Sequence, residues 1–179
     1  MAAGATIHTF TVNLADVDRG VYEELTLRVA RHPSETDAFM LTRVLAYCLE
    51  YEEGIAFSEG ISATDEPAVL VRDLTGSLQA WIEVGAPDAA RLHSGSMQAA
   101  RTAVYTHRDP AKVVAPWQGK RIHRAENIPV RSFDAGFVDR GAASIERRND
   151  MTLSVTEQRL YLDINGTSLE SALHERAAV

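Results

Sequence analysis

Disulfide-forming cysteines, signal-peptide features and long apolar runs are missing from this 179-residue chain. Its single cysteine, Cys48, cannot build a disulfide framework, which excludes the small disulfide-stabilised secreted domains. No apolar run approaches the ~18 residues that cross a bilayer. The opening stretch, MAAGATIHTFTVNL, has neither a basic flank nor an apolar core. We therefore expect a cytoplasmic protein that does not span a membrane.

Several motifs that bind nucleotides or metals, or that supply a nucleophile, are also absent. The chain contains no glycine-rich phosphate loop and no GxGxxG, CxxC, HExxH or GxSxG sequence. Its six histidines show no metal-ligand spacing, which argues against a zinc site. Cys48 has no activating partner nearby in the sequence, so we expect it to serve packing. With these motifs absent, Asp and Glu carboxylates are the remaining candidates for a chemical site.

Charge is unevenly distributed along the chain. The net charge of −7 argues against a general attraction to nucleic acid, because phosphate neutralisation needs a basic surface. Residues 35–88 nevertheless hold eleven acids against two arginines, whereas residues 101–148 hold ten Lys or Arg against five acids. An acidic centre beside a basic segment suits a metal-dependent phosphodiester site. Ordinary variation in surface charge explains the same numbers equally well.

Apolar spacing predicts one α+β domain over residues 1–179, in which helices flank a mixed β-sheet. Alternating Phe10, Val12 and Leu14 indicate a strand over 6–14. A repeat every four residues at Val21, Leu25 and Val29 predicts a helix over 21–32. The centre of the chain then predicts a helix over 35–52, strands over 55–58, 67–73 and 77–84, a helix over 88–100 and a strand over 102–107.

The last third of the chain predicts shorter elements. Asp109-Pro110 indicates a helix start, since proline suits the first helical position. We then expect a strand over 121–130, a helix from Asp134 to about Glu146, and a hairpin of alternating apolar residues between 151 and 164. Residues after Glu170 are expected to form a frayed tail.

Two acids in the centre of the chain are candidates for a site. Asp73 and Glu83 lie ten residues apart, on either side of a Leu-Thr-Gly turn, and would come close if the flanking strands pair. Mg²⁺ takes one or two carboxylates and keeps positions open for a phosphate oxygen. Glu50, from the helix over 35–52, would add a further ligand. Because this spacing is common, two exposed acids at strand ends are the simpler interpretation from the spacing alone.

Several blocks of the sequence resemble the YaeQ family of small bacterial proteins. They are ARHPSET at 30–36, DEP at 65–67, DLTG at 73–76, WIEVGAPD at 81–88 and QAA at 98–100. The similarity covers nearly the whole chain. It implies a restriction-endonuclease-like fold, a variant of the PD-(D/E)XK nuclease core in which two helices and a set of strands surround the site.

The resemblance also implies roles for individual residues. Asp73 resembles the first motif aspartate, and Glu83 resembles the acid of the (D/E)-x-K element. Gln98, followed by Tyr105, resembles a glutamine–tyrosine element found in some nuclease subgroups, and Glu50 resembles the acid on the first helix. The implied metal ligands for Mg²⁺ are therefore Asp73, Glu83 and Glu50.

The chain departs from the nuclease pattern at Gly85, where the motif has a lysine that activates water and stabilises charge on the phosphate. Arg91 and Gln98 lie seven residues apart on one helix face, so Arg91 could supply the positive charge from there. An arginine stays protonated, however, and cannot act as a general base.

Three functions follow from these observations. One is a Mg²⁺-dependent nuclease or phosphodiesterase with Asp73, Glu83, Gln98 and Arg91 as catalytic residues and the basic segment holding nucleic acid. The second is a catalytically inactive nuclease-fold module that binds nucleic acid, which Gly85 and the acidic net charge favour. The third is an interaction protein with no affinity for nucleic acid.

Overall fold

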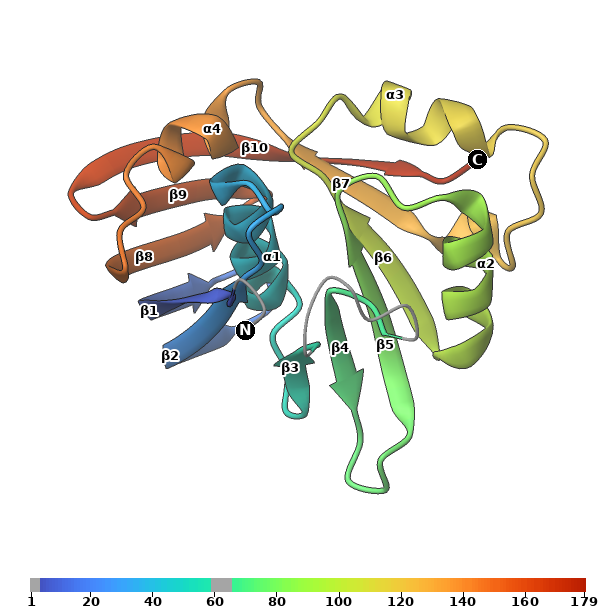
Figure 1. The fold of residues 1–179 in the computed structure, drawn as a ribbon, viewed down its shortest axis with the longest axis horizontal. Helices are drawn as coiled ribbons and strands as arrows, with labels where there is room; N and C mark the ends of the chain where they lie inside the picture. Colours follow the sequence, from blue (N-terminus) through green and yellow to red (C-terminus); the bar gives the residue numbers. More distant parts are fainter. Residues whose placement is uncertain (1–3, 59–65) are drawn as a thin grey trace. The chain divides into compact units, whose positions relative to one another are not determined.

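Two compact units, interleaved along the chain, make up the computed structural model, which describes residues 4–58 and 66–179. Unit 1 contains residues 1–41 and 133–174, and unit 2 contains residues 42–132 and 175–179. Both units combine helices with a mixed arrangement of parallel and antiparallel strands (Figure 1). The predicted α+β class with a mixed sheet is therefore confirmed, and the single domain over 1–179 stays a prediction.

Unit 1 is built on five strands. They are β1 (Thr6–Asp16), β2 (Val21–Arg31), β8 (Arg148–Thr156), β9 (Arg159–Ile164) and β10 (Thr167–Ala177). They pair in the order β2-β1-β8-β9-β10, and every pair is antiparallel except β1 with β8. The alternating apolar residues of β1, β8 and β9 are buried while their neighbours are polar, so this sheet has one apolar face and one polar face. The predicted strand at 6–14 and the hairpin between 151 and 164 are confirmed.

The predicted helix over 21–32 is wrong, because this stretch is strand β2. Leu25, Leu27 and Val29 are buried, and the residues between them are exposed. A repeat every four residues also fits a period of two, so the spacing that suggested a helix is equally that of a strand. Gly20, with φ at +68°, completes the turn that folds β2 back against all of β1.

The C-terminal prediction is also wrong, since residues after Glu170 are ordered. Strand β10 runs to Ala177, its Ser171 is fully buried, and Ala178 is buried in unit 2, where its amide donates to Ile128 O at 3.0 Å. Backbone pairing holds a strand whose side chains are mostly polar, and a polar sequence alone does not reveal that pairing.

Two other elements in the last third differ from the prediction. Most of the expected strand at 121–130 is a loop with a short 3₁₀ turn, η2 (Ala125–Asn127), and β7 begins only at Pro129 and ends at Phe133. Helix α4 (Phe137–Ala142) is shorter than expected and begins after Gly136. Asp134 does not cap it, because its carboxylate accepts from the Ala172 amide at 3.2 Å and contacts His174 Nε2 at 2.7 Å.

Unit 2 contains the central elements in the predicted order. They are the C-terminal part of α1 (Asp37–Leu49), β3 (Ile55–Phe57), β4 (Val69–Arg72), β5 (Leu78–Val84), α2 (Ala89–Gln98) and β6 (Arg101–Tyr105). Helix α3 (Pro110–Val114), the 3₁₀ helix η1 (Ala115–Trp117) and strand β7 follow. The strands β3, β4 and β5 are antiparallel, and β5, β6 and β7 are parallel. Asp109 caps α3 by accepting from the Ala111 amide at 3.0 Å, with Pro110 at the first helical position, as predicted.

Across the described residues, no helix is long and apolar enough to cross a membrane. That the protein does not span a membrane stays a prediction. The cytoplasmic location stays a prediction.

Candidate functional site

Asp73 lies in the exposed turn between β4 and β5. Its Oδ1 accepts from the Thr75 hydroxyl at 2.6 Å, from the Thr75 amide at 2.9 Å and from the Ser77 amide at 2.9 Å. Its Oδ2 accepts from Gln79 Nε2 at 3.0 Å. The hydrogen bond from the Thr75 hydroxyl, with those from neighbouring amides, lowers the pKa of Asp73. These contacts are those of a residue that shapes a turn.

The structure does not bring Asp73 and Glu83 together, so the predicted proximity of the two acids is wrong. In the β4–β5 hairpin Arg72 pairs with Leu78, and Val69 pairs with Ile82. Asp73 therefore lies at the turn end of the hairpin and Glu83 at its open end, about 17 Å apart at ~3.3 Å per residue. A hairpin brings together residues that are equally far from its turn, and these two are not.

Glu83 is buried on the side of β5 that faces α2, with only 4% of its surface exposed. Arg91, from the first turns of α2, donates from Nε to Glu83 Oε2 at 2.6 Å and from Nη2 to the Glu66 carbonyl at 2.5 Å. Glu83 Oε1 is buried and has no hydrogen-bond partner among the residues that the structure describes. Burial raises the pKa of Glu83, and the ion pair with Arg91 opposes that rise.

Glu66 is a member of this site that sequence reasoning missed. It directly precedes Pro67 and lies three residues before the start of β4 at Val69. Since β4 is antiparallel to β5, Glu66 lies beside the end of β5 that carries Glu83. Its carboxylate lies 3.9 Å from the guanidinium of Arg72. The DEP block was a usable signal, because an acid before β4 is better placed than one after it. Asp65 of that block lies outside the described residues.

Glu50 anchors a second, separate cluster at the end of α1. Its buried carboxylate accepts from Arg101, from the Tyr105 hydroxyl at 2.5 Å and from Arg131 Nη1 at 2.5 Å. Arg131 also donates to the Tyr105 oxygen at 2.8 Å and to Glu175 at 2.9 Å. Burial and the nearby Glu50 charge raise the pKa of Tyr105 well above its usual range.

Glu50 and Glu83, the two buried glutamates among the described residues of unit 2, lie on opposite faces of the sheet in that unit. In the parallel pairing of β5 with β6, Glu83 is opposite Val104 and Val84 is opposite Tyr105. Since successive residues of a strand point to opposite faces, Glu83 lies on one face and Tyr105, with its partner Glu50, lies on the other. Glu50, Asp73 and Glu83 are therefore three separate positions. Across the part of the chain that the structure describes, no three His, Cys, Asp or Glu side chains form a group that could hold a metal ion.

Gln98 and Gly85 do not complete a catalytic site around Glu83. Gln98 is exposed, and its amide donates back to Ser94 O at 3.2 Å. The helix face predicted for it does include Gly95, which lies against Trp81. Gly85 is two residues after Glu83, but it does not continue the strand face of Glu83, because β5 ends at Val84 and Gly85 has φ at +93°. A lysine at position 85 would therefore be in the left-handed region, which favours glycine.

This geometry defines a class of α+β protein. In unit 2, the buried acids Glu50 and Glu83 are paired with arginines at two separate places. The family model described as YaeQ protein matches residues 1–173, and the chain belongs to the YaeQ family. The protein named Uncharacterized protein YaeQ of Escherichia coli (strain K12) is 32% identical over 172 residues, which cover 95% of this chain and 94% of that protein. The protein of the same name from Salmonella typhi is 31% identical over 175 residues, covering 97% and 96%.

Two crystal structures of YaeQ proteins have the same fold. The protein from Xanthomonas axonopodis pv. citri superimposes with a TM-score of 0.86 at 27% identity, covering 96% of this chain and 98% of that one. The protein from Pseudomonas syringae superimposes with a TM-score of 0.85 at 32% identity, covering 96% and 95%. The family assignment made from the sequence blocks is therefore confirmed.

The raised pKa of Glu83 predicts a pH dependence of stability. The folded protein holds the proton on the Glu83 carboxyl more tightly than the unfolded chain does, where the pKa of this group has its ordinary value of 4.5. The stabilising contribution of the proton is therefore complete below pH 4.5 and is lost as pH rises through the raised pKa. We expect Glu83→Gln to remove this loss, so that the variant gains stability relative to the unmodified protein as pH rises above 4.5. Urea denaturation across this pH range measures the difference.

Asp73→Asn is the matched control with the opposite sign. The lowered pKa of Asp73 contributes stability above its ordinary value of 3.8, and this contribution is lost as pH falls through the lowered pKa. Its effect should therefore shrink on acidification. A difference between Glu83→Gln and the unmodified protein that stays constant with pH would contradict the assignment of the titration to Glu83.

Proposed function

We propose that this protein is a catalytically inactive nuclease-fold module that binds nucleic acid. The element order α1-β3-β4-β5-α2-β6, with antiparallel β3, β4 and β5 and a parallel β6, supports a restriction-endonuclease-like core of the PD-(D/E)XK variant type. It is the order of helices and strands that the family resemblance implied.

The observation that carries the absence of catalysis is the ion pair between Arg91 and Glu83 at 2.6 Å. The motif acid already has a fixed cation beside it, and that cation also holds the Glu66 carbonyl at 2.5 Å. A guanidinium can bind phosphate, but it cannot lower the pKa of a bound water as a metal ion does.

The residues predicted to hold Mg²⁺ do not fit that ion. Oxygen ligands of Mg²⁺ lie ~2.0–2.1 Å from a common point. Asp73 and Glu83 are at opposite ends of a hairpin, and Glu50 is on the other face of the sheet. We therefore assign no chemical step to a metal here.

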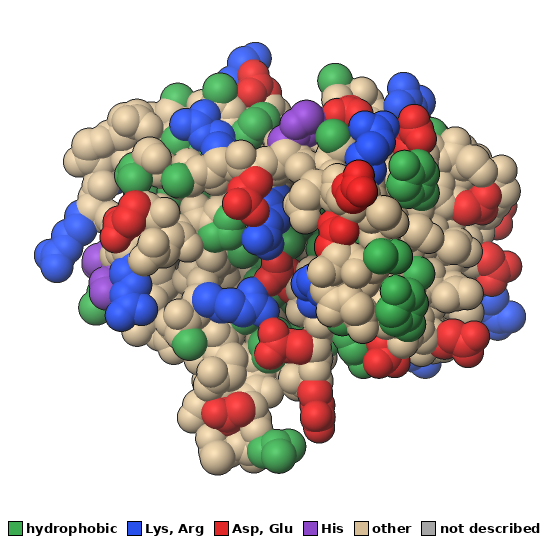
Figure 2. All heavy atoms as spheres, turned by 180° about the vertical axis from the view of Figure 1, so that it is seen from behind, with side chains coloured by type: hydrophobic (Ala, Val, Ile, Leu, Met, Phe, Trp, Pro, Cys, Tyr) green, Lys and Arg blue, Asp and Glu red, His purple; other side chains and the backbone are tan. Residues whose placement is uncertain are grey.

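Exposed cations in the segment between β6 and β7 support binding to nucleic acid. Arg108, Lys112, Lys120, Arg121 and Arg124 are all exposed, whereas the acids of this segment are only two, Asp109 and Glu126. Figure 2 shows acidic and basic side chains intermixed over one face of the molecule, so attraction to phosphate must be local. Lysine and arginine side chains that neutralise phosphates release counterions and make the affinity depend on salt.

The salt dependence of binding to a fluorescently labelled DNA duplex, measured by anisotropy, tests this proposal. We expect binding at low salt without cleavage in Mg²⁺ or Mn²⁺. The triple variant Lys112→Ala/Lys120→Ala/Arg121→Ala should reduce the slope of log affinity against log salt by about 1 for each phosphate contact removed, and therefore by up to ~3. Arg28→Ala/Arg147→Ala/Arg148→Ala removes the same charge from exposed positions in unit 1 and should change the slope less.

Two results would overturn the proposal in different ways. Metal-dependent cleavage that is lost in Glu83→Gln would establish the nuclease or phosphodiesterase alternative, with Glu83 as a metal ligand. An absence of binding to both DNA and RNA at low salt would leave the interaction protein as the remaining function.

A further inference from the structure

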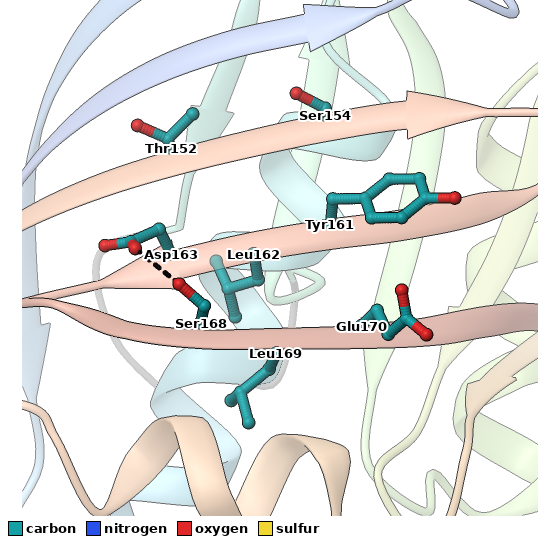
Figure 3. Close-up of a pocket in the computed structure, with 8 residues that line it drawn as sticks. All are labelled: Thr152, Ser154, Tyr161, Leu162, Asp163, Ser168, Leu169 and Glu170. Carbon is teal, nitrogen blue, oxygen red and sulfur yellow. Dashed lines mark hydrogen bonds between the residues drawn. The ribbon is translucent and has the colours of Figure 1, made fainter.

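The polar face of the sheet in unit 1 is hollowed over all five strands. One cavity of about 440 Å³ lies over β8, β9 and β10, and a second of about 640 Å³ lies over β1, β2, β8 and β9. Thr152 and Asp163 line both, so the two hollows adjoin. Figure 3 shows the first, with Tyr161 and Glu170 at one end and Asp163 bonded to Ser168 at the other.

The strand pairing arranges the side chains of this face in rows. Asn13 pairs with both Glu24 and Thr152, Thr152 pairs with Asp163, and Asp163 pairs with Ser168. One row across the five strands therefore reads Glu24, Asn13, Thr152, Asp163 and Ser168. The next row, two residues further along, includes Ser154, Tyr161 and Glu170.

The linings of both hollows are acidic, and Arg159, on the same face of β9 as Tyr161 and Asp163, pairs with Glu170. Neither cavity is lined by any Lys, Arg or His, and the acids that line them are Glu24, Asp150, Asp163 and Glu170. Three of these acids, on the adjacent strands β8, β9 and β10, are offset by two residues from strand to strand and so form a diagonal line. With strands ~4.8 Å apart and a rise of ~6.7 Å for two residues, neighbouring acids are about 8 Å apart.

Their existing contacts leave room for a ligand. Asp163 accepts from the Ser168 hydroxyl at 2.8 Å and from the Gly166 amide at 3.2 Å, and Glu170 lies 3.3 Å from Arg159. A carboxylate can accept about four hydrogen bonds, so neither group is saturated by these partners. The ring of Tyr161, which is 43% exposed, lies beside Glu170 on the same face and can contact a cation.

We propose that this face binds an extended segment of a partner protein that carries Lys or Arg at alternate positions. In an extended chain, residues i, i+2 and i+4 project to one side ~6.7 Å apart. This is close to the ~8 Å between the acids, and long flexible side chains cover the difference. A shared divalent cation would need oxygens within ~2.6 Å of one point, which acids about 8 Å apart do not provide. Nucleic acid would be repelled by the same charges.

Two synthetic peptides of equal composition test the alternation directly. A labelled KTKTKT peptide and a labelled KKKTTT peptide carry the same charge, but only the first presents its lysines on one side of an extended chain. Binding of each peptide is measured by anisotropy at an ionic strength of about 0.01 M. We expect the alternating peptide to bind several-fold more tightly than the KKKTTT peptide. This comparison uses the unmodified protein and does not depend on the folding of a variant.

Charge-neutral variants then locate the site. We expect Asp150→Asn/Asp163→Asn/Glu170→Gln to weaken binding of KTKTKT about tenfold, since each of three exposed ion pairs contributes a factor of about two. Asp139→Asn/Glu146→Gln/Glu157→Gln removes equal charge from exposed residues of unit 1 outside the cavities and should weaken it much less.

Equal binding of the two peptides, or an equal loss in the two triple variants, would overturn the proposal and leave only general attraction between opposite charges. Displacement of KTKTKT by an equal concentration of spermine would also overturn it, in favour of a polyamine site. The proposal concerns unit 1 and does not depend on the nucleic-acid function assigned to unit 2.

Discussion

Replacing Glu50 by alanine is expected to lower the free energy of unfolding by about 3–5 kcal/mol, because it breaks a buried ion pair by removing one partner. The Glu50 side chain is only 4% exposed, and its carboxylate accepts from Arg101, Tyr105 and Arg131. Without it, the buried Tyr105 hydroxyl loses its acceptor and Arg131 loses its buried counter-charge. Urea denaturation followed by circular dichroism measures the change.

Glu52→Ala is the matched control at the same helix end. Its carboxylate is 49% exposed and pairs with Arg101 at 2.9 Å, so its loss should cost only about 0–1 kcal/mol. Tyr105→Phe removes one donor to Glu50, and a double-mutant cycle with Glu50→Gln should give a coupling energy of about 0.5–3 kcal/mol. Similar losses for Glu50→Ala and Glu52→Ala would contradict a buried network.

The partners of Glu50 in this network could not be predicted from the sequence. An acid near the end of the first helix is visible in the sequence, but its partners are 51, 55 and 81 residues away along the chain. No local spacing connects Glu50 with Arg101, Tyr105 and Arg131. They meet because β5, β6 and β7 are parallel, which places Tyr105 and Arg131 side by side.

Elements with a distinctive local pattern were predictable from the sequence. The α1, β5, α2 and β6 elements combine a clear apolar period with a terminating glycine, proline or capping acid, and the structure contains them where expected. The helix predicted for β2 failed because its chosen residues fit both periods. The C-terminal part of β10 failed because backbone hydrogen bonds hold it, and these leave no trace in side-chain hydrophobicity.

The site was only half predictable for a related reason. Alternation along β5 places Trp81 and Glu83 on one face, and helical spacing places Arg91 and Gly95 on one face of α2. The contact between these two faces depends on the tertiary structure and cannot be predicted from local spacing. Asp73 was misjudged because separation along the chain says little about distance in space unless the pairing register is known.

The meeting of these two faces predicts a large effect for Gly95→Ala. A β-carbon on Gly95 would stand 2.2 Å from Trp81 Cε2 and 2.4 Å from Nε1, well inside contact distance with a rigid indole. Trp81 is 2% exposed, so the ring has little room to move. Alanine favours a helix over glycine by about 1 kcal/mol, but overpacking a tight core costs about 1–3 kcal/mol or more. We expect a net loss of stability of about 2 kcal/mol in urea denaturation.

Gly141→Ala in α4 separates the effect of packing from that of helix propensity. Its added β-carbon would meet only ends of flexible side chains, with Leu41 Cδ2 at 2.9 Å and Leu162 Cδ2 at 3.5 Å. These side-chain ends can shift, so the change in stability should stay within about 1 kcal/mol.

Because Arg91 lies one turn before Gly95 on α2, displacement of the helix by Gly95→Ala should also weaken the Arg91–Glu83 pair. The pH dependence that depends on Glu83 should then change in Gly95→Ala and not in Gly141→Ala. If Gly95→Ala were as stable as Gly141→Ala, with the pH profile intact, the close contact between α2 and β5 would not be what holds this pair in place.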